Sequence, residues 1–295
     1  MSSQEMLGGV PLDGEPHTGV GGARRVVGPS LVVGGALVLL VVVMALVSFV
    51  WTPHDPTLVD PAHRLEGPSG SYWFGTDKFG RDVFSQVLVG ARTTLFVGFV
   101  SVGLAALVGV PVGLLAAVAP RWLGDTLMRV NDIVLAFPAL LLAIMLTAAL
   151  GQSTLVAMVA IGVATIPGFA RLIRSGGLQV MGTEYVLAAR VAGRRTGAIA
   201  RRHVLPNVTN LVIVQASVSF AIAVLAEAAL SFLGYGTPPP TPSWGRMLQE
   251  SQEMLFTAPR LAVFPGVAIA VAVLGFNLMG DGLRDLLDPK LEDRQ

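Results

Sequence analysis

The sequence contains no cysteine, which excludes disulfide bonds and thiolate metal sites. Charged residues make up only 13% of its 295 residues, whereas a soluble domain usually carries about 25%. The net charge of +1 gives no electrostatic support for binding nucleic acid. Apolar residues reach 53%, with a mean hydropathy of +0.69. So much apolar surface does not fit inside one water-soluble core, and it predicts an integral membrane protein.

Motifs for catalysis and ion coupling are also missing. The sequence has no glycine-rich phosphate loop of the Walker type. No series of acidic residues crosses the apolar segments, as a proton relay would require. The four histidines fall outside the apolar segments, without metal-ligand spacing. We therefore predict no catalytic residue, no metal site and no cofactor bound by this chain, and a secondary transporter is disfavoured.

Six segments are apolar enough, at about 20 residues or more, to span a hydrocarbon core of roughly 30 Å. They lie near residues 30–51, 93–118, 130–150, 153–174, 207–233 and 261–282. Gly109 and Gly113 form a small-x-x-x-small pair in the second segment, which favours close approach of another helix. Asn131 and Asp132 lie at the start of the third, where capping and interfacial pairing are the expected roles. The fold class is thus all-α, with six transmembrane helices.

A further short helix is expected in the long polar connection between the first two segments. Val83, Phe84, Val87 and Leu88 fall on one face at helical spacing. Asp82 precedes them, where a carboxylate suits the helix dipole. The pattern predicts a short helix that lies along the outer surface of the membrane.

The basic residues predict the orientation. With the N-terminus in the cytoplasm, fourteen of the 20 Lys and Arg residues fall on the cytoplasmic side and six outside, as the positive-inside bias favours. Both termini are then cytoplasmic. The chain divides into a cytoplasmic, disordered tail (1–28), the first helix with its outer loop (29–92), a core of five helices with a cytoplasmic loop at 175–206 (93–285), and a cytoplasmic tail (286–295).

The cytoplasmic loop has the features of a helical projection. Thr183 can cap a helix and Glu184 favours its dipole. Ala188 and Ala189 keep one face thin, so that the helix can enter a groove. Gly193 can adopt the left-handed conformation that ends a helix. Spacing alone leaves open a second reading, a solvated basic loop that merely follows the positive-inside rule.

The same stretch resembles the cytoplasmic coupling motif of permease subunits of bacterial ABC importers: Glu-Ala-Ala, three residues, Gly, nine residues, a hydrophobic residue, one residue, Leu-Pro. The matching residues are Ala188, Ala189, Gly193, Leu205 and Pro206. Leu187 stands at the usual glutamate position and His203 at the usual hydrophobic one. Glu184 and Tyr185 upstream, with the ending His-x-Leu-Pro-Asn, are similar to the dipeptide, oligopeptide and nickel branch of that family.

Three further blocks resemble the same branch. They lie at 74–92, 227–245 and 277–289. With the coupling motif they extend the resemblance over roughly residues 30–290, in the expected order. The match is to the second permease subunit of these systems.

This resemblance implies the fold of a type I ABC importer permease in a bacterial inner membrane. The implied partners are a homologous second permease, two ABC ATPase subunits that carry ATP and Mg, and an extracytoplasmic binding protein. Short peptides are the implied substrate, with nickel or another small solute as alternatives. The implied ATPase-coupling residues are Glu184, Tyr185, Ala188, Ala189, Gly193, Leu205 and Pro206. A membrane scaffold or sensor that binds a soluble partner through the same loop is the hypothesis from another class.

Four charged residues are candidates for the pathway or an outer gate. Glu227 is an acid within an apolar span, where an ionisable group is paired or faces a water-filled cavity. A structural bond to a neighbouring helix is the favoured interpretation. Asp77, Arg81 and Asp82 can touch a docking protein, or tie the outer loop together, which we favour.

Overall fold

The structure, a computed structural model, describes residues 28–287 and consists almost entirely of helices. In chain order these are α1 (Pro29–Val50), α2 (Val83–Val118), α3 (Arg121–Leu135), α4 (Ala139–Leu150), α5 (Thr154–Met181), α6 (Glu184–Val191), α7 (Thr196–Ile199), α8 (Leu205–Phe232), α9 (Trp244–Ser251) and α10 (Arg260–Leu287). Two 3₁₀ turns, Pro61–His63 and Gln252–Met254, and a π turn, Ala200–Val204, complete the helical elements. The predicted disorder of the N-terminal tail lies outside the described residues.

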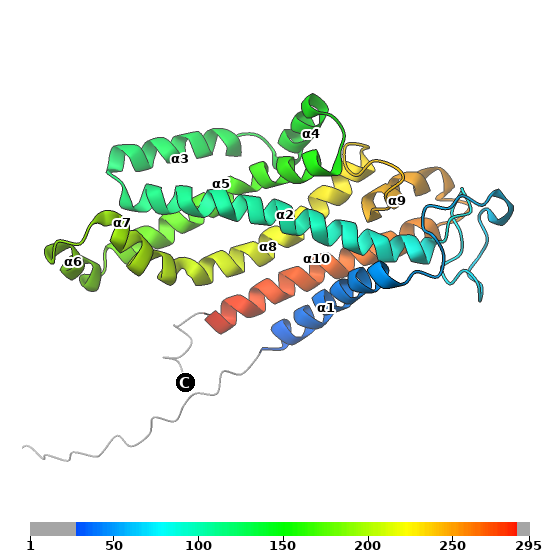
Figure 1. The fold of residues 1–295 in the computed structure, drawn as a ribbon, viewed down its shortest axis with the longest axis horizontal. Helices are drawn as coiled ribbons and strands as arrows, with labels where there is room; N and C mark the ends of the chain where they lie inside the picture. The colour runs from blue at the N-terminus through cyan, green and yellow to red at the C-terminus, as the bar shows by residue number, and fades with distance from the viewer. Residues whose placement is uncertain (1–27, 288–295) are drawn as a thin grey trace, which may run out of the picture.

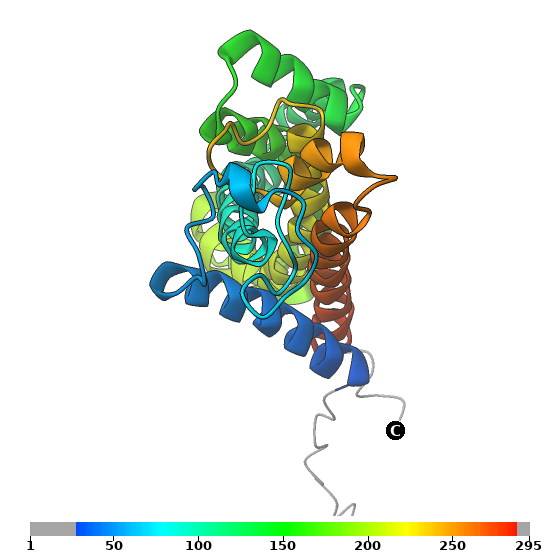
Figure 2. The same ribbon diagram turned by 90° about the vertical axis from the view of Figure 1, so that its right-hand side faces the viewer.

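Five helical stretches are long and apolar enough to cross a membrane: α1, α2, α5, α10 and the continuous run from α7 through α8. The pair α3–α4 is the sixth if both count as one span. The prediction of an all-helical, six-span protein is confirmed. Figures 1 and 2 show α1 beside α10 on one flank of the bundle, and α3 and α4 on the opposite flank.

The third span differs from the prediction of one helix over 130–150. α3 begins well before that range, and α4 follows it after a bend of 80°. Pro138 explains the bend, because proline disfavours helical geometry in the residue before it and lacks the N–H that a continuing helix needs. The fourth predicted segment, 153–174, corresponds to α5, which runs past the expected end to Met181.

Of the two expected roles, capping does not occur, because Asn131 and Asp132 both lie inside α3, whereas both side chains do pair with a neighbouring helix. Asn131 is buried, and its Nδ2 donates a hydrogen bond to the carbonyl of Pro167 on α5 at 3.2 Å. The Asp132 carboxylate accepts a hydrogen bond from Arg171 at 2.7 Å. Both side chains therefore attach α3 to α5.

The prediction of a short surface helix around residues 83–88 is wrong. Those residues form the first turns of α2, which is 36 residues long in total. Asp82 does start the helix, since its carboxylate accepts hydrogen bonds from the backbone N–H groups of Phe84 and Ser85. The apolar face expected to rest on lipid is instead buried within the protein, with Val83 and Val87 at 1% and 3% exposure.

Trp244, at the start of α9, covers this part of α2. Its indole Nε1 donates to the carbonyl of Val87 at 2.9 Å, and the side chain is fully buried. Gly90 makes room for the ring, because a Cβ there would lie 2.5 Å from the Trp244 Cδ1. Protein therefore covers the face of α2 that was predicted to lie along the membrane surface.

The predicted small-x-x-x-small contact is confirmed, and its partner is α5. A Cβ at Gly109 would lie 2.6 Å from the Cβ of Phe169, and one at Gly113 would lie 2.5 Å from the carbonyl oxygen of Ala170. The two backbones therefore approach too closely for any side chain. Gly34, Gly275 and Gly282 allow a similar approach between α1 and α10.

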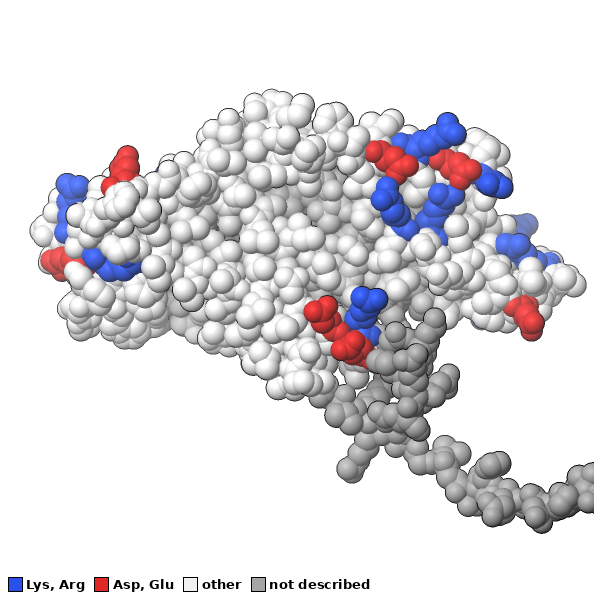
Figure 3. Space-filling view, turned by 180° about the vertical axis from the view of Figure 1, so that it is seen from behind, with Lys and Arg blue, Asp and Glu red and all other residues white. Residues whose placement is uncertain are grey.

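Charged side chains gather toward the ends of the molecule. Figure 3 shows Lys, Arg, Asp and Glu at the α9 end, at the α6–α7 end and near the end of α10, with an uncharged face between. This is the distribution expected when a hydrocarbon layer surrounds the middle of the bundle.

Replacing Gly109 with valine is expected to destabilise the protein, because the added atoms meet the backbone of α5. Overpacking of this kind costs about 1–3 kcal/mol, so the midpoint of thermal unfolding in detergent should fall. Gly103→Val is the matched control on the same helix, since a Cβ there meets nothing within 4 Å. Equal midpoints for the two variants would contradict the close α2–α5 contact.

Candidate functional site

A helical projection joins α5 to α8. It comprises residues 183–204, hereafter the knob, and contains α6, α7 and the π turn. Figure 1 shows it at the end of the bundle opposite α9. All of the coupling residues expected from the sequence lie in the knob or in the first turn of α8.

Gly193 shapes the knob. Its φ of +75° confirms the predicted left-handed conformation. Its N–H donates to the Arg190 carbonyl at 2.9 Å, and the N–H of Arg194 donates to the Ala189 carbonyl at 3.1 Å. This pair of bonds satisfies the last carbonyls of α6 and turns the chain toward α7. A Cβ at Gly193 would meet no atom within 4 Å, so the backbone conformation alone calls for glycine.

The start of α6 differs in one respect from the prediction. Thr183 occupies the N-cap position, but its hydroxyl makes no capping bond. The hydroxyl instead donates to the carbonyl of Val180 at 2.6 Å, at the end of α5. Glu184 lies in the first turn of α6, as predicted, where its charge favours the helix dipole.

The base of the knob is fixed to the bundle by apolar side chains. Val186 of α6, Ile199 of α7 and Val204 of the π turn are each at most 1% exposed. They pack in one cluster with Ile173 of α5 and Val208 of α8. The base of the knob is therefore packed against α5 and α8, two of the helical stretches long enough to cross a membrane.

The outer face of the knob is exposed and partly apolar. Val191 is 91% exposed, Leu187 48% and Tyr185 46%. The Tyr185 ring lies 6.0 Å from the ring of His203, so two positions that are distant in the sequence meet on this face. Exposed apolar side chains on a short rigid helix can enter a groove in another protein.

The knob leads into α8 without a break, because helical geometry continues from Thr196 to Phe232. Leu205 and Pro206 form the first turn of α8, directly after the π turn. The N–H of Leu205 donates to the carbonyl of Ala200, which is the wider π pattern. Pro206 lies within a continuous helix. We attribute this to the wider π turn before it, which leaves room for the proline ring.

At the α9 end, Arg81 joins the loop after α1 to α9. Its guanidinium contacts the Asp77 carboxylate at 2.6 Å and also the carboxylate of Glu250. Glu250 in turn accepts a hydrogen bond from Arg246 at 2.8 Å. Asp77 and Arg81, two of the candidate outer-gate residues, therefore belong to one ion-pair network.

Asp82 belongs to the same loop. Besides capping α2, its Oδ2 accepts a hydrogen bond from the Ser85 hydroxyl at 2.6 Å and lies 3.4 Å from Nδ1 of His54. The Asp82 side chain is 2% exposed. All of its observed contacts are within the loop and the first turn of α2.

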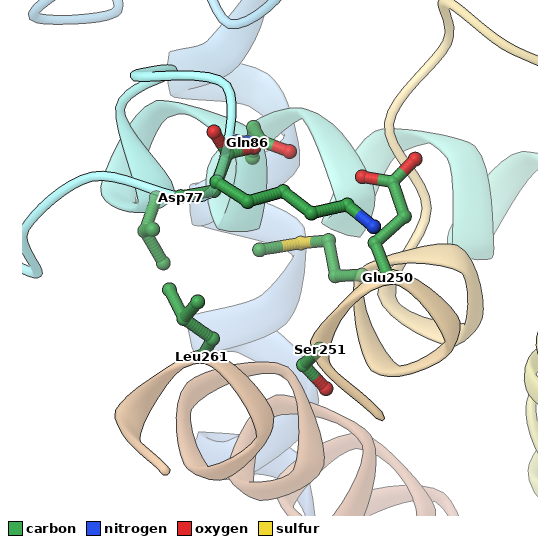
Figure 4. Close-up of a pocket in the computed structure, with 8 residues that line it drawn as sticks. Asp77, Gln86, Glu250, Ser251 and Leu261 are labelled. Atoms are coloured by element: carbon green, nitrogen blue, oxygen red, sulfur yellow. Dashed lines mark hydrogen bonds between the residues drawn. The ribbon is translucent and has the colours of Figure 1, made fainter. Parts of the chain in front are cut away.

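A small pocket lies between the loop, α2, α9 and α10. Figure 4 shows Asp77, Gln86, Glu250, Ser251 and Leu261 around it. Its volume of about 20 Å³ has room for roughly one water molecule. The pocket is therefore a packing feature and is too small for a solute of peptide size.

Glu227 lies near the end of α8 and is 1% exposed. Its Oε1 accepts a hydrogen bond from the Ser231 hydroxyl at 2.7 Å, and that hydroxyl accepts one from the N–H of Thr237 at 3.0 Å. The other carboxyl oxygen of Glu227 and the Thr237 hydroxyl are both buried without a partner in the described chain. The bond of Glu227 therefore lies within α8 and not to a neighbouring helix, as had been expected, while Ser231 attaches the segment after α8 to the helix.

Some partners of these residues were not predicted from the sequence. Glu250 and the anchors Val186, Ile199 and Val204 are the main examples. Glu250 carries no local signal, since it lies 169 residues from Arg81. Among residues 28–287 no group of three His, Asp or Glu side chains could hold a metal ion.

The fold and the knob define the class of this protein, which is a helical, multi-pass membrane protein with a helical projection at one end. Residues 109–293 match the family of the binding-protein-dependent transport system inner membrane component. The chain belongs to this family, and it is the permease subunit of an importer.

Relatives cover most of the chain. It is 42% identical to the dipeptide transport system permease protein DppC of Alkalihalophilus pseudofirmus, over 88% of this chain and 86% of the relative. It is 40% identical to the glutathione transport system permease protein GsiD of Pectobacterium atrosepticum, over 88% and 87%. It is 41% identical to the di/tripeptide permease DppC of Pseudomonas aeruginosa, over 88% of each chain.

A solved structure supports the fold. The MetNI methionine ABC transporter, in inward-facing conformations, contains a chain that matches with a TM-score of 0.58 at 20% identity. The match covers 69% of this chain and 97% of the other. At this identity it shows that the fold is shared.

The loop after α1 supplies a test of local electrostatics. The hydrogen bond between Nδ1 of His63 and Asp60, at 2.7 Å, raises the pKa of the imidazole above its usual 6.5. Because the pKa is raised in the folded state, the His63–Asp60 pair stabilises the loop fully below pH 6.5, as long as Asp60 remains ionised. This stabilisation is lost as the pH rises through the folded-state pKa. An NMR titration should give a His63 pKa above 6.5, and Asp60→Asn should lower it. A pKa that does not respond to Asp60→Asn would contradict the pairing.

Proposed function

We propose that this permease is one half of the pathway of an ATP-driven importer, and that ATPase subunits act on it through the knob. The observation that carries the proposal is the combination of an exposed apolar face on α6 with a fully buried base. A close-packed contact has low compressibility, so a displacement of α6 is passed on to the helices that its base contacts. Family membership supports the proposal, since the chain itself has no phosphate-binding loop.

The proposed assembly has five parts. A homologous second permease completes the pathway, two ABC ATPase subunits bind ATP and Mg, and an extracytoplasmic binding protein delivers the solute. When ATP binding brings the ATPases together, they move α6, and the cluster around Val186 and Ile199 carries the motion to α5 and α8. The bundle then shifts between inward- and outward-open states, a two-state equilibrium biased by a remote ligand.

We assign the seven coupling residues by their places in the knob and in the first turn of α8. Glu184 favours the dipole of α6, while Tyr185 and Ala188 lie on its exposed side. Ala189 and Gly193 take part in the C-terminal cap that sets the direction of α7. Leu205 and Pro206 open α8, so that the motion of the knob enters the membrane there.

The orientation that fits this mechanism places the knob and both termini in the cytoplasm and α9 outside, in a bacterial inner membrane. The arginines of the knob support it through the positive-inside bias. The proposed divisions follow: tails at 1–28 and 286–295, a first helix with its outer loop at 29–92, and a permease core at 93–285 with the coupling loop at 175–206.

At the outer end we propose structural roles for Asp77, Arg81, Asp82 and Glu227. The first three have their contacts within the loop, α2 and α9, and Glu227 bonds to Ser231. These contacts keep the outer surface in a fixed shape onto which a binding protein can dock. None of the four needs to touch the transported solute.

Short peptides are the proposed substrate. The support comes from the names of the relatives, which are permeases for dipeptides, for di- and tripeptides and for glutathione. Pockets in the described residues do not identify the solute, and a separate binding protein is expected to select it.

A matched pair of glycines tests the lever. Gly193→Ala forces a left-handed conformation on a residue with a side chain, which costs about 1–2 kcal/mol, whereas Gly197→Ala meets no such strain. A Cβ at either position has nothing within 4 Å. In a reconstituted transporter, Gly193→Ala should lower dipeptide uptake per ATP hydrolysed severalfold, with normal membrane insertion.

Gly197→Ala should transport at the parental ratio. If the Gly193 variant, at equal abundance, takes up dipeptide at that ratio as well, the knob does not couple ATP hydrolysis to transport.

A further inference from the structure

A groove with a volume of about 460 Å³ is open to the surroundings at the α9 end of the bundle. It lies where α1 ends, α5 begins and the segment before α9 passes α2. Phe49 is the second-last residue of α1, Thr154 is the first of α5, and Thr241 precedes α9. Because the ends of spanning helices lie near the membrane surface, this groove is at the depth where lipid headgroups meet acyl chains.

The walls of the groove are mainly apolar. Phe96 of α2 and Leu155 of α5 line it and are 58% and 69% exposed. Thr93 is buried beside them, and its hydroxyl donates a hydrogen bond to the carbonyl of Pro242 at 3.0 Å. This bond fixes the segment before α9 against α2. The groove is therefore bounded by packed elements, and its open apolar side chains favour an apolar ligand.

Arg92 of α2 also lines the groove and is partly buried. Its guanidinium lies over the ring of Phe49, 4.6 Å from the centroid. Within residues 28–287 it forms no ion pair, whereas Arg81 and Arg246 at the same end of the molecule both contact Glu250. A guanidinium is always charged, and a charge at the edge of a hydrocarbon layer is costly unless an anion or water reaches it.

We infer that this groove binds an anionic phospholipid, whose phosphate pairs with Arg92 and whose acyl chain lies along Phe96 and Leu155. An amphiphile satisfies both parts of the groove, while a soluble anion would leave the apolar walls uncovered. The planar fork of arginine suits phosphate oxygens, and basic pockets between membrane helices bind anionic headgroups. The site does not depend on the proposed transport function; only its assignment to the outer leaflet rests on the proposed orientation.

The test measures lipid binding by the chain, purified in detergent with the subunits that remain bound to it. Native mass spectrometry gives the dissociation constant of the first bound lipid, for phosphatidylglycerol and for phosphatidylcholine with the same acyl chains. Arg92→Gln removes the charge, and Leu155→Trp fills the groove from an exposed position. Arg64→Gln is the control, because Arg64 is exposed at the same end and its Nε donates to the carbonyl of Lys78.

The parent should bind phosphatidylglycerol more tightly than phosphatidylcholine. Arg92→Gln should reduce that preference roughly fivefold, the effect of one basic residue at an anionic surface. Leu155→Trp should weaken the binding of both lipids, and Arg64→Gln should change neither.

Three results would overturn the inference. The first is a parent without preference for phosphatidylglycerol. The second is lipid binding that neither groove substitution alters, as expected if another subunit covers the groove. The third is displacement of phosphatidylglycerol by inorganic phosphate together with no effect of Leu155→Trp, which would show that the groove holds a phosphate group and not a lipid.

Discussion

A peptide group that pairs with nothing inside a bilayer costs several kcal/mol, and most of this structure follows from that constraint. It keeps the spanning segments helical. Helices in lipid then associate by close packing, and the glycines where α2 meets α5 let the two backbones approach. Within residues 28–287 one span is divided, at Pro138, because proline lacks the N–H that a continuing helix needs.

The two ends of the bundle are built differently, and the difference matches their proposed tasks. At the α9 end, ion pairs and the buried Trp244 fix the loop after α1 onto α2 and α9, which gives a rigid surface. At the other end, the knob has a buried base and an exposed apolar face. In the proposed function, a binding protein docks on the fixed surface at the α9 end, and an ATPase subunit moves the projecting helix of the knob. Leu187, at a position that is usually glutamate in the motif, is 48% exposed, so it offers a partner an apolar side chain and no carboxylate.

Features set by local sequence could be predicted, and features set by distant partners could not. The Gly109–Gly113 pair and the left-handed Gly193 follow from spacing and backbone chemistry, and the structure has both. The apolar face at 83–88 has the same pattern whether lipid or protein covers it, and Trp244, 157 residues from Val87, decides the matter. Thr183 and Asn131 also show this limit: each has a capping side chain, but a neighbouring carbonyl accepts its hydrogen bond instead.

The central claim is that this permease works in an assembly that ATPases drive through the knob. The most direct test is to extract the tagged chain from its native membrane in mild detergent and to identify its partners by mass spectrometry, with and without a cross-linker attached at Leu187→Cys. The account predicts recovery of a second permease and ABC ATPase subunits, with the cross-link joining the knob to an ATPase. Recovery of the chain alone, or with unrelated soluble proteins on the knob, would contradict it and favour a scaffold or sensor role.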